Sequence, residues 1–230
     1  MICSILQPHY LPWIGYFSMI NNVDEFIFLD DVQFIKREWK NRNKIRKTKD
    51  SNDYSWITVP IKKESQKKKI FECEIDYFYD WQNDHLNKIK NVYSKTPYFD
   101  EIYETILSKI NLRYNFLSEL NIELIKLIME YLEINTKLIT SSKIIVDGKK
   151  DVKMLNISKK IKAKKILINK LSENYLDKEI FDKNNIEVIV QNFVEKKYKQ
   201  CNKDVVLEWI PKLSIIDILF NCGKNTKNFL

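Results

Sequence analysis

The first thirty residues alternate between strand-like and helix-like patterns, and this alternation constrains the fold more than any other feature of the chain. Residues 1–7 form an apolar run, residues 13–23 place aromatic side chains on a helical face, and residues 25–29 (EFIFL) are continuously apolar. A continuous apolar run is typical of a parallel strand that is buried on both faces. A strand, a helix and a second strand of these lengths are a candidate right-handed crossover. The pattern therefore predicts an α/β fold.

The same alternation continues to the end of the chain. Further helices are predicted at 80–95, 96–111, 118–134, 152–163, 176–186 and 213–221. Further strands are predicted at 54–61, 70–76, 136–144, 165–169 and 187–193. The lysine-rich segment 62–69 is expected to be a mobile loop. We predict one α/β domain over 1–230, with a mainly parallel sheet, flanking helices and a helical insertion, or subdomain, at about 80–134.

The composition excludes several classes of protein. No apolar stretch approaches the roughly 20 residues that a helix needs to cross a bilayer, and the first ten residues carry neither the basic region nor the cleavage site of a signal peptide. These absences predict a cytoplasmic protein without a membrane span. The four cysteines are scattered, without a C-x-x-C pair, and there are only two histidines. We therefore predict free thiols and no metal site.

The charge balance is basic, with 39 Lys and Arg residues against 31 Asp and Glu and a net charge of +8. Such a surface permits the binding of phosphates or of an acidic partner protein. Because lysine greatly outnumbers arginine, solvated lysine faces explain the excess better than a nucleic-acid groove, and no nucleic-acid partner is predicted. With three glycines in total, the chain has no glycine-rich phosphate-binding loop, which argues against the common kinds of ATP or NAD chemistry.

Two groups of polar residues are predicted to meet at one edge of the sheet. Gln7, Pro8 and His9 follow the first strand, and Asp30 and Asp31 follow the second. The carboxyl ends of parallel strands lie on the same side of a sheet, where ligands of α/β proteins bind. Adjacent strand residues point to opposite faces, so one of the two carboxylates is expected to enter the site. There it would act as a base or bind the amine of a substrate. The alternative is that Asp31 caps the next turn and Asp30 is solvated.

The loop after these carboxylates carries a dense set of hydrogen-bond donors. The forked guanidinium of an arginine suits a phosphate or a carboxylate, so an anionic or sugar-like ligand is predicted. The alternative is a solvated surface loop. Nearby Trp and Tyr residues suit a stacking wall for a sugar or a base, although such residues more often form core. The candidate donors are Gln33, Lys36, Asn41, Arg42 and Asn43.

The two histidines are candidates for proton transfer, and each has a plainer alternative. His9 lies beside Tyr10 in a loop that two prolines and a glycine shape. His85 lies on the apolar face of the helix predicted at 80–95, where a histidine beside Trp81 is more often a core residue with a hydrogen-bond partner. Asp31 and the two histidines are therefore the catalytic candidates.

Five motifs, in this order, resemble those of the WbqC-like family: QPHYLPWIGYF, DDVQFIKREWKNRN, WITVPI, KYKQ and LSIIDILFN. The resemblance runs over almost the whole chain, from Gln7 to Asn221. Bacterial members of this family are often encoded in gene clusters for O-antigen, capsule and other surface polysaccharides. The family pattern falls on Gln7, Pro8, Pro12, Gly15, Asp30, Asp31, Val32, Gln33, Lys36, Asn41, Arg42, Tyr198, Gln200, Ser214, Asp217 and Asn221.

The resemblance implies an activity. The family's gene contexts, beside amino-sugar enzymes and acyl-carrier proteins, imply an acyl or aminoacyl transfer that forms an amide on a nucleotide-linked amino sugar. The donor would be a thioester of an acidic acyl-carrier protein or of CoA, with no tightly bound cofactor. This reaction needs a base, expected to be Asp31 or His85, and donors for the oxyanion. The implied substrate contacts are Gln7, Tyr10, Asp30, Gln33, Lys36, Asn41, Arg42, Asn43, Tyr198, Gln200 and Asn221.

Two departures from the family pattern bear on this prediction, and two other functions compete with it. The residue at position 9 varies in the family, which weakens His9 as a general catalytic residue. The stretch NKLSENYL, which follows KILIN, lacks the glycine pair that the family often has there. A second enzyme hypothesis uses Cys3 as a covalent acyl acceptor. The alternative to an enzyme is a non-catalytic sugar- or nucleotide-binding accessory protein of a glycan assembly pathway.

Overall fold

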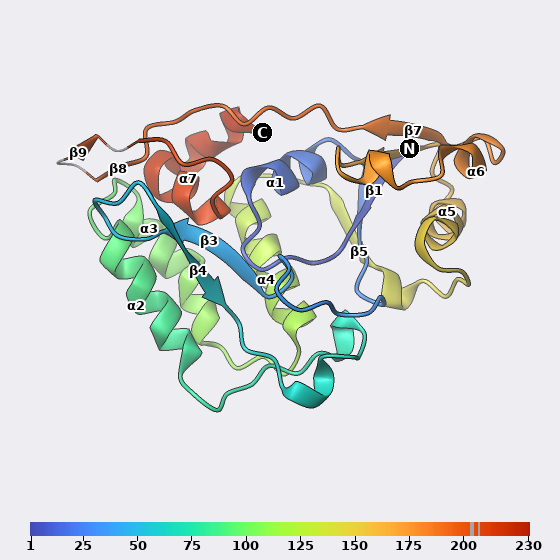
Figure 1. Cartoon of the computed structure of the whole chain (residues 1–230). Coiled ribbons are helices and arrows are strands. Elements are labelled where there is room, and N and C mark those ends of the chain that lie inside the picture. Colours follow the sequence, from blue (N-terminus) through green and yellow to red (C-terminus); the bar gives the residue numbers. More distant parts are fainter. Residues whose placement is uncertain (203–204, 207) are drawn as a thin grey trace.

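A five-stranded parallel sheet forms the centre of the computed structural model, which describes residues 1–202, 205–206 and 208–230 (Figure 1). The strands follow the order β5-β2-β1-β6-β7. In the register, Ser4 of the central strand lies opposite Phe26 on one side and Leu167 on the other. The prediction of an α/β fold with a mainly parallel sheet is confirmed. The strands are β1 (Ile2–Leu6), β2 (Glu25–Phe28), β5 (Lys137–Thr140), β6 (Lys165–Ile168) and β7 (Glu187–Val190).

The connections between the strands place helices on both faces of the sheet. Helices α1 (Ile14–Asn21) and α4 (Leu117–Tyr131) share a large apolar core on one face. Helices α5 (Lys150–Lys160) and α6 (Lys178–Asp182) share a smaller core on the other face. The sheet is therefore doubly wound, and the direction of winding reverses between β1 and β6. Ligands of such sheets bind beyond the carboxyl ends of the strands at this switch point.

The segment between β2 and β5 packs beside the sheet with the last helix of the chain. Figure 1 shows these elements together on the left and α5 and α6 on the right. One apolar core continues from the sheet face into this segment, where the ring of Phe220 stacks on that of Tyr93 at 4.8 Å. None of the described helices is long and apolar enough to span a bilayer. The elements of this part are β3 (Arg42–Arg46), β4 (Tyr54–Thr58), α2 (Trp81–Tyr93), α3 (Phe99–Thr105) and α7 (Ile215–Cys222).

The hairpin strand β3 is not predicted by the sequence, because its residues are mostly charged or polar. In the structure Ile45 and Arg46 are buried, and the backbone of β3 pairs with β4 so that Lys44 lies opposite Trp56. The buried arginine is accommodated by hydrogen-bond partners that lie far along the chain, including Gln200. Local sequence pattern does not reveal partners of this kind.

The predicted strand at 70–76 is wrong for its first half, which forms a short 3-10 turn at Ile70–Glu72. Its backbone groups bond to the loop after β2 instead of to a sheet: the Phe71 N–H donates to the Asp30 carbonyl at 3.0 Å. The lysine-rich segment before it runs along the same loop, and the Lys68 carbonyl accepts the N–H of Phe34 at 3.0 Å. These backbone hydrogen bonds hold the loop after β2 against the segment 68–71.

Candidate functional site

The loop that follows β1 lies at the switch point of the sheet. Residues 7–13 leave the carboxyl end of β1, between β2 and β6, and lead into α1 (Figure 1). Leu11 has a left-handed backbone conformation, with a φ of 42°, which a residue with a branched side chain adopts only under strong restraint. Gln7 is half-buried, and its carbonyl accepts the hydroxyl of Tyr16 at 2.9 Å. The loop therefore has a defined shape.

Side chains from three distant elements hold the backbone carbonyls of this loop. Asn121 of α4 donates to the carbonyl of Pro8 at 3.0 Å, and Asn43 of β3 donates to that of Leu11 at 2.6 Å. Ser214, at the N-cap of α7, also donates to the Leu11 carbonyl, at 2.7 Å. All three side chains are buried, so each bond satisfies groups that water does not reach. Asn43, a predicted substrate contact, thus has a structural role.

The imidazole of His9 forms no hydrogen bond with any residue that the structure describes. The side chain is partly exposed, and its ring lies 5.2 Å from that of Tyr16. The surrounding protein, and then the charge of Lys40, lower the pKa of His9 to about 3. The imidazole is therefore neutral at physiological pH. A neutral ring nitrogen without a partner is able to accept a proton from a ligand.

Lys40 is a buried cation beside His9 that the sequence does not single out. It is 1 % exposed, and its ammonium pairs with the carboxylate of Glu38. Burial lowers the pKa of Lys40 to about 8. Asn121 donates to the Lys40 carbonyl at 2.7 Å, so this one amide holds both the loop that carries His9 and the segment that carries Lys40. Ionisable groups with shifted pKa values are common at functional sites.

The two aspartates after β2 are held by the loop after β5. Asp30 is 3 % exposed, and it accepts bonds from the backbone N–H and the hydroxyl of Ser142 at 2.8 and 2.7 Å. The hydroxyl of Ser141 lies within hydrogen-bonding distance of both carboxylates, and Asp31 pairs with Lys153 of α5. Asp30 thus joins β2 to β5. Asp31 keeps some contact with solvent, but a role as a base requires it to leave this ion pair.

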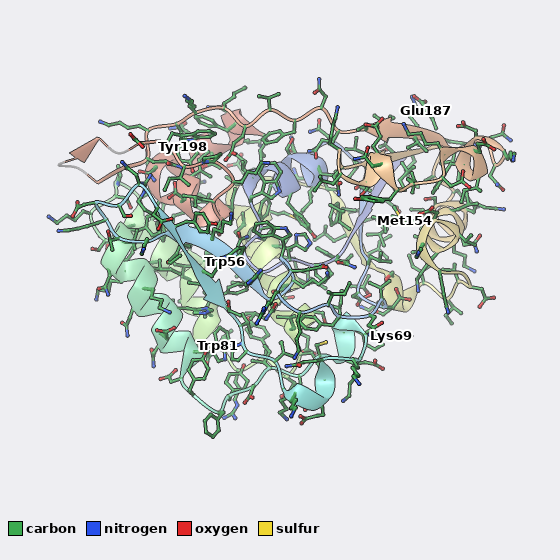
Figure 2. All side chains as sticks on the ribbon, in the orientation of Figure 1. Trp56, Lys69, Trp81, Met154, Glu187 and Tyr198 are labelled. Atoms are coloured by element: carbon green, nitrogen blue, oxygen red, sulfur yellow. The ribbon has the colours of Figure 1, made fainter. Side chains whose placement is uncertain are left out.

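His85 lies in the apolar core and not at the sheet edge. It is 1 % exposed on α2, and its Nδ1 is 3.0 Å from the hydroxyl of Tyr10. Its ring lies 5.2 Å from the indole of Trp81, near the lower end of α2 in Figure 2. Tyr10 is also fully buried. A substrate reaches neither side chain unless the core opens, so both positions are those of structural residues.

The free energy of unfolding is expected to fall as the pH is lowered from about 6.5 towards 4. Burial lowers the pKa of His85 to about 4, whereas an imidazole in the unfolded chain titrates near 6.5. Between these values the unfolded state binds more protons than the folded state, so acid destabilises the fold, by up to about 3 kcal/mol for this residue. Urea denaturation at pH 7.5, 5.5 and 4.5 measures the effect. The variant His85→Gln should show a flatter pH profile, and a profile as steep as that of the wild type would contradict this account.

The predicted donors of the loop after β2 have different surroundings. Gln33 and Lys36 are exposed and remain available to a ligand. The guanidinium of Arg42 stacks over the ring of Trp56 at 4.1 Å. Asn41 is buried and donates to the backbone that follows β4 at 2.9 Å, while its side-chain oxygen has no partner among the described residues. An unpaired buried acceptor of this kind has a free energy cost of about 1–3 kcal/mol.

The family residues of the C-terminal half form a buried polar network. Asp217 of α7 is fully buried and accepts the hydroxyls of Tyr93 and Tyr198 at 2.8 and 2.7 Å. Gln200 donates to the Tyr198 hydroxyl at 3.0 Å and accepts from the guanidinium of Arg46 at 2.8 Å. Burial raises the pKa of Asp217, and the bonds from the tyrosines oppose this shift. Tyr198 and Gln200, predicted as substrate contacts, therefore join the C-terminal segment to β3 and α2.

The buried thiols disfavour covalent catalysis by cysteine. Cys3 is fully buried, and this burial raises the pKa of its thiol to about 11. Cys73 is also buried, and its pKa is raised to about 12. Since the thiolate is the nucleophile, neither residue suits an acyl acceptor at neutral pH. Within the described part of the chain, no three His, Cys, Asp or Glu side chains converge as ligands for a metal ion.

The structure brings together part of the predicted site. Gln7 and His9 share the loop after β1, and the aspartates lie at the end of the adjacent strand β2. Asn221 instead donates to the Asp217 carbonyl within α7 at 2.8 Å. Sequence reasoning misses Lys40, which resembles the solvated lysines around it. It also misses Asn121, whose only signal is an amide inside a strongly apolar helical pattern.

Comparisons with known proteins assign the chain to a family. A model of the WbqC-like protein family matches residues 7–229. A protein of Mycobacterium tuberculosis (strain H37Rv), described as uncharacterized, is 35% identical over 235 residues, which cover 99% of this chain and 96% of that protein. No solved structure matches the chain. Because the family match spans nearly the whole sequence and confirms the resemblance of the motifs, the chain belongs to the WbqC-like protein family.

Proposed function

We propose that the chain is an N-acyl- or aminoacyltransferase that uses a thioester to form an amide on a nucleotide-linked amino sugar. Its family is associated with polysaccharide gene clusters, where amino sugars are modified. The observation that carries the proposal is the imidazole of His9. It is neutral, partly exposed and without a hydrogen bond to the described residues, and buried side chains hold its loop at the switch point of the sheet.

The proposed reaction needs a base close to the attacking amine. The amine nitrogen attacks the carbonyl carbon of the thioester, and His9 accepts the proton that the nitrogen loses. The C–N bond forms, the C–S bond breaks as the tetrahedral intermediate collapses, and the imidazole returns the proton to the leaving thiolate. Lys40 is buried and paired with Glu38, so it acts on the negative charge that develops on the carbonyl oxygen only through its electrostatic field and not by a hydrogen bond.

The pKa of His9 is expected to depend on whether the nucleotide is bound. A pKa of about 3 makes free His9 a weak base, and general bases are most effective when their pKa lies near the working pH. Burial is the larger cause of this low value and Lys40 the second. A diphosphate bound at the surface near His9 would offset the charge of Lys40, which is itself buried and paired with Glu38, and so raise the pKa of His9. In this proposal the imidazole becomes a stronger base when the substrate is bound.

Two exposed donors of the loop after β2 suit the substrates in this proposal. Lys36 and Gln33 are exposed, so they are available to a phosphate or to sugar hydroxyls. The net charge of +8 favours association with an acidic carrier protein. The non-catalytic alternative, a sugar- or nucleotide-binding accessory protein, uses the same exposed donors but needs no base.

An assay by mass spectrometry tests the proposal. The purified protein is incubated with a panel of nucleotide-linked amino sugars and with acyl-loaded carrier protein or acyl-CoA. We expect a protein-dependent product whose mass equals that of the sugar plus the acyl group, less one hydrogen, together with release of the thiol. Binding of a nucleotide sugar in calorimetry without any amide across the panel would instead identify an accessory binding protein.

A further inference from the structure

A groove of about 580 Å³ opens on the sheet face beside α1. Its floor is formed by Leu167 of β6 and Ile189 of β7, on the side of the sheet where α1 and α4 pack. The crossover from β6 to β7 places α6 on the opposite face, so no described helix covers this floor. One wall is α1, and the other is the segment 190–196 together with the end of the chain. The volume is typical of small-molecule sites, which occupy roughly 300–1,000 Å³.

One end of the groove adjoins the loop that carries His9. Trp13, where this loop enters α1, packs edge-on against Phe193 in the groove wall, with 5.6 Å between the ring centroids. Gln191, also in the wall, donates to the Gly15 carbonyl at 3.0 Å. The indole of Trp13 lies so close over Gly15 that a Cβ at that position would come within 2.3 Å of it. The loop and the groove wall are therefore in direct contact.

The other end of the groove lies at the amino-terminal edge of the sheet. Ile2, the first residue of β1, and Asn22, which follows α1, line it there. The groove thus runs along the strands, from the edge where they begin to the edge where His9 lies. A long, thin ligand fits this course better than a compact one.

The lining combines an apolar floor with amide groups at the rim. Amide side chains donate and accept hydrogen bonds with amides of a ligand. A linear ligand with methylene groups and two amides matches this lining. The apolar residues are Ile2, Leu167, Ile189, Phe193, Val194, Phe229 and Leu230, and the polar ones are Ser18, Asn22, Gln191, Asn192 and Lys196.

We propose that this groove binds the phosphopantetheine arm of the thioester donor. The proposal rests on the proposed transferase function and names the site of its donor. The arm is shared by CoA and acyl-carrier proteins. Its methylene groups lie on Leu167 and Ile189, its amides contact the rim, and its thioester reaches the end of the groove beside Trp13. This places the acyl carbon next to the loop of His9 and the phosphate at the opposite end of the groove, near Ile2 and Asn22.

Two surface variants test the groove without disturbing the fold. Val194 lines the groove and is 75 % exposed, and Ile145 is 92 % exposed and lies outside it. Val194→Arg fills the groove with a long side chain, and Ile145→Arg adds the same charge elsewhere. Calorimetry of the full chain with pantetheine and with CoA should show binding to the wild type and to Ile145→Arg. We expect the affinity of Val194→Arg to be at least about tenfold weaker.

The outcomes separate the groove from the transferase function. Wild-type protein that does not bind pantetheine, or Val194→Arg protein that binds it as tightly as the wild type, overturns the groove assignment. Binding does not depend on turnover, so a protein that binds the arm in the groove but forms no amide contradicts only the transferase function. Amide formation with an unchanged KM for the donor in Val194→Arg contradicts only the groove.

Discussion

The variant His9→Gln is expected to form the amide about 100- to 10,000-fold more slowly than the wild type, which is the usual effect of losing a general base. Glutamine has a similar size and polarity but does not accept a proton at neutral pH. Since His9 makes no hydrogen bond with the described residues and is partly exposed, its replacement should change the free energy of unfolding by less than about 1 kcal/mol. Initial rates by mass spectrometry and urea denaturation measure the two effects.

The other catalytic candidates provide matched controls for this result. His85→Gln breaks the contact with the Tyr10 hydroxyl, so it should lower stability and leave the rate per folded molecule within about threefold. Asp31→Asn weakens the ion pair with Lys153 and should also keep most of the rate. Wild-type turnover in His9→Gln, combined with a large loss in Asp31→Asn, would move the role of base from the imidazole to the carboxylate.

The prediction for His9 applies to this chain and not to every member of the family. The resemblance implies that the residue at position 9 varies among relatives, whereas the loop around it carries the family's Gln, Pro and Gly residues. The contacts of the loop explain its shape in this chain, because its carbonyls are held by Asn121, Asn43 and Ser214. The proposed base at position 9 is therefore a prediction for this chain and not for the family as a whole.

The sequence predicts the elements whose side chains follow a local period. The pattern of the first thirty residues places β1, α1 and β2 within about two residues of their observed bounds, because apolar burial sets both the strands and the helix. It does not predict β3, since Arg46 of that strand is buried only with the help of Gln200, 154 residues later. The charge pattern of β3 is therefore explained by tertiary contacts and not by local propensity.

The candidate site is predictable only in its outline. The rule for strand ends correctly brings His9 and the aspartates to neighbouring strand ends. The chemistry of each group depends on partners that are distant in the sequence. Asp30 accepts a hydrogen bond from Ser142, 112 residues away, and the Tyr10 hydroxyl is hydrogen-bonded to His85, 75 residues away. No local pattern distinguishes these hydrogen-bonded groups from His9, which has no such partner in the described structure.

The variant Asp217→Ala is expected to lower the free energy of unfolding by about 3–5 kcal/mol. The carboxylate is fully buried and accepts two tyrosine hydroxyls, from Tyr93 and Tyr198. Without it both hydroxyls lose their acceptor, and the buried guanidinium of Arg46 loses the negative charge that acts on it. Unpaired buried groups are costly because water does not replace the lost partner. Urea denaturation at pH 7.5 gives the change directly.

The variant Asp217→Asn tests whether the loss comes from hydrogen bonding or from charge. Its side-chain oxygen still accepts one tyrosine hydroxyl, so a loss of about 1–3 kcal/mol, smaller than that of the alanine variant, is expected if hydrogen bonds dominate. An equal loss in both variants would assign the effect to the missing negative charge beside Arg46. A loss under about 1 kcal/mol in both variants would show that the network contributes little to stability.

Helix α7 also carries Ser214 at its N-cap, which holds the Leu11 carbonyl. A weakened network should therefore loosen the loop of His9 and lower the rate of amide formation by more than the fraction of unfolded protein explains.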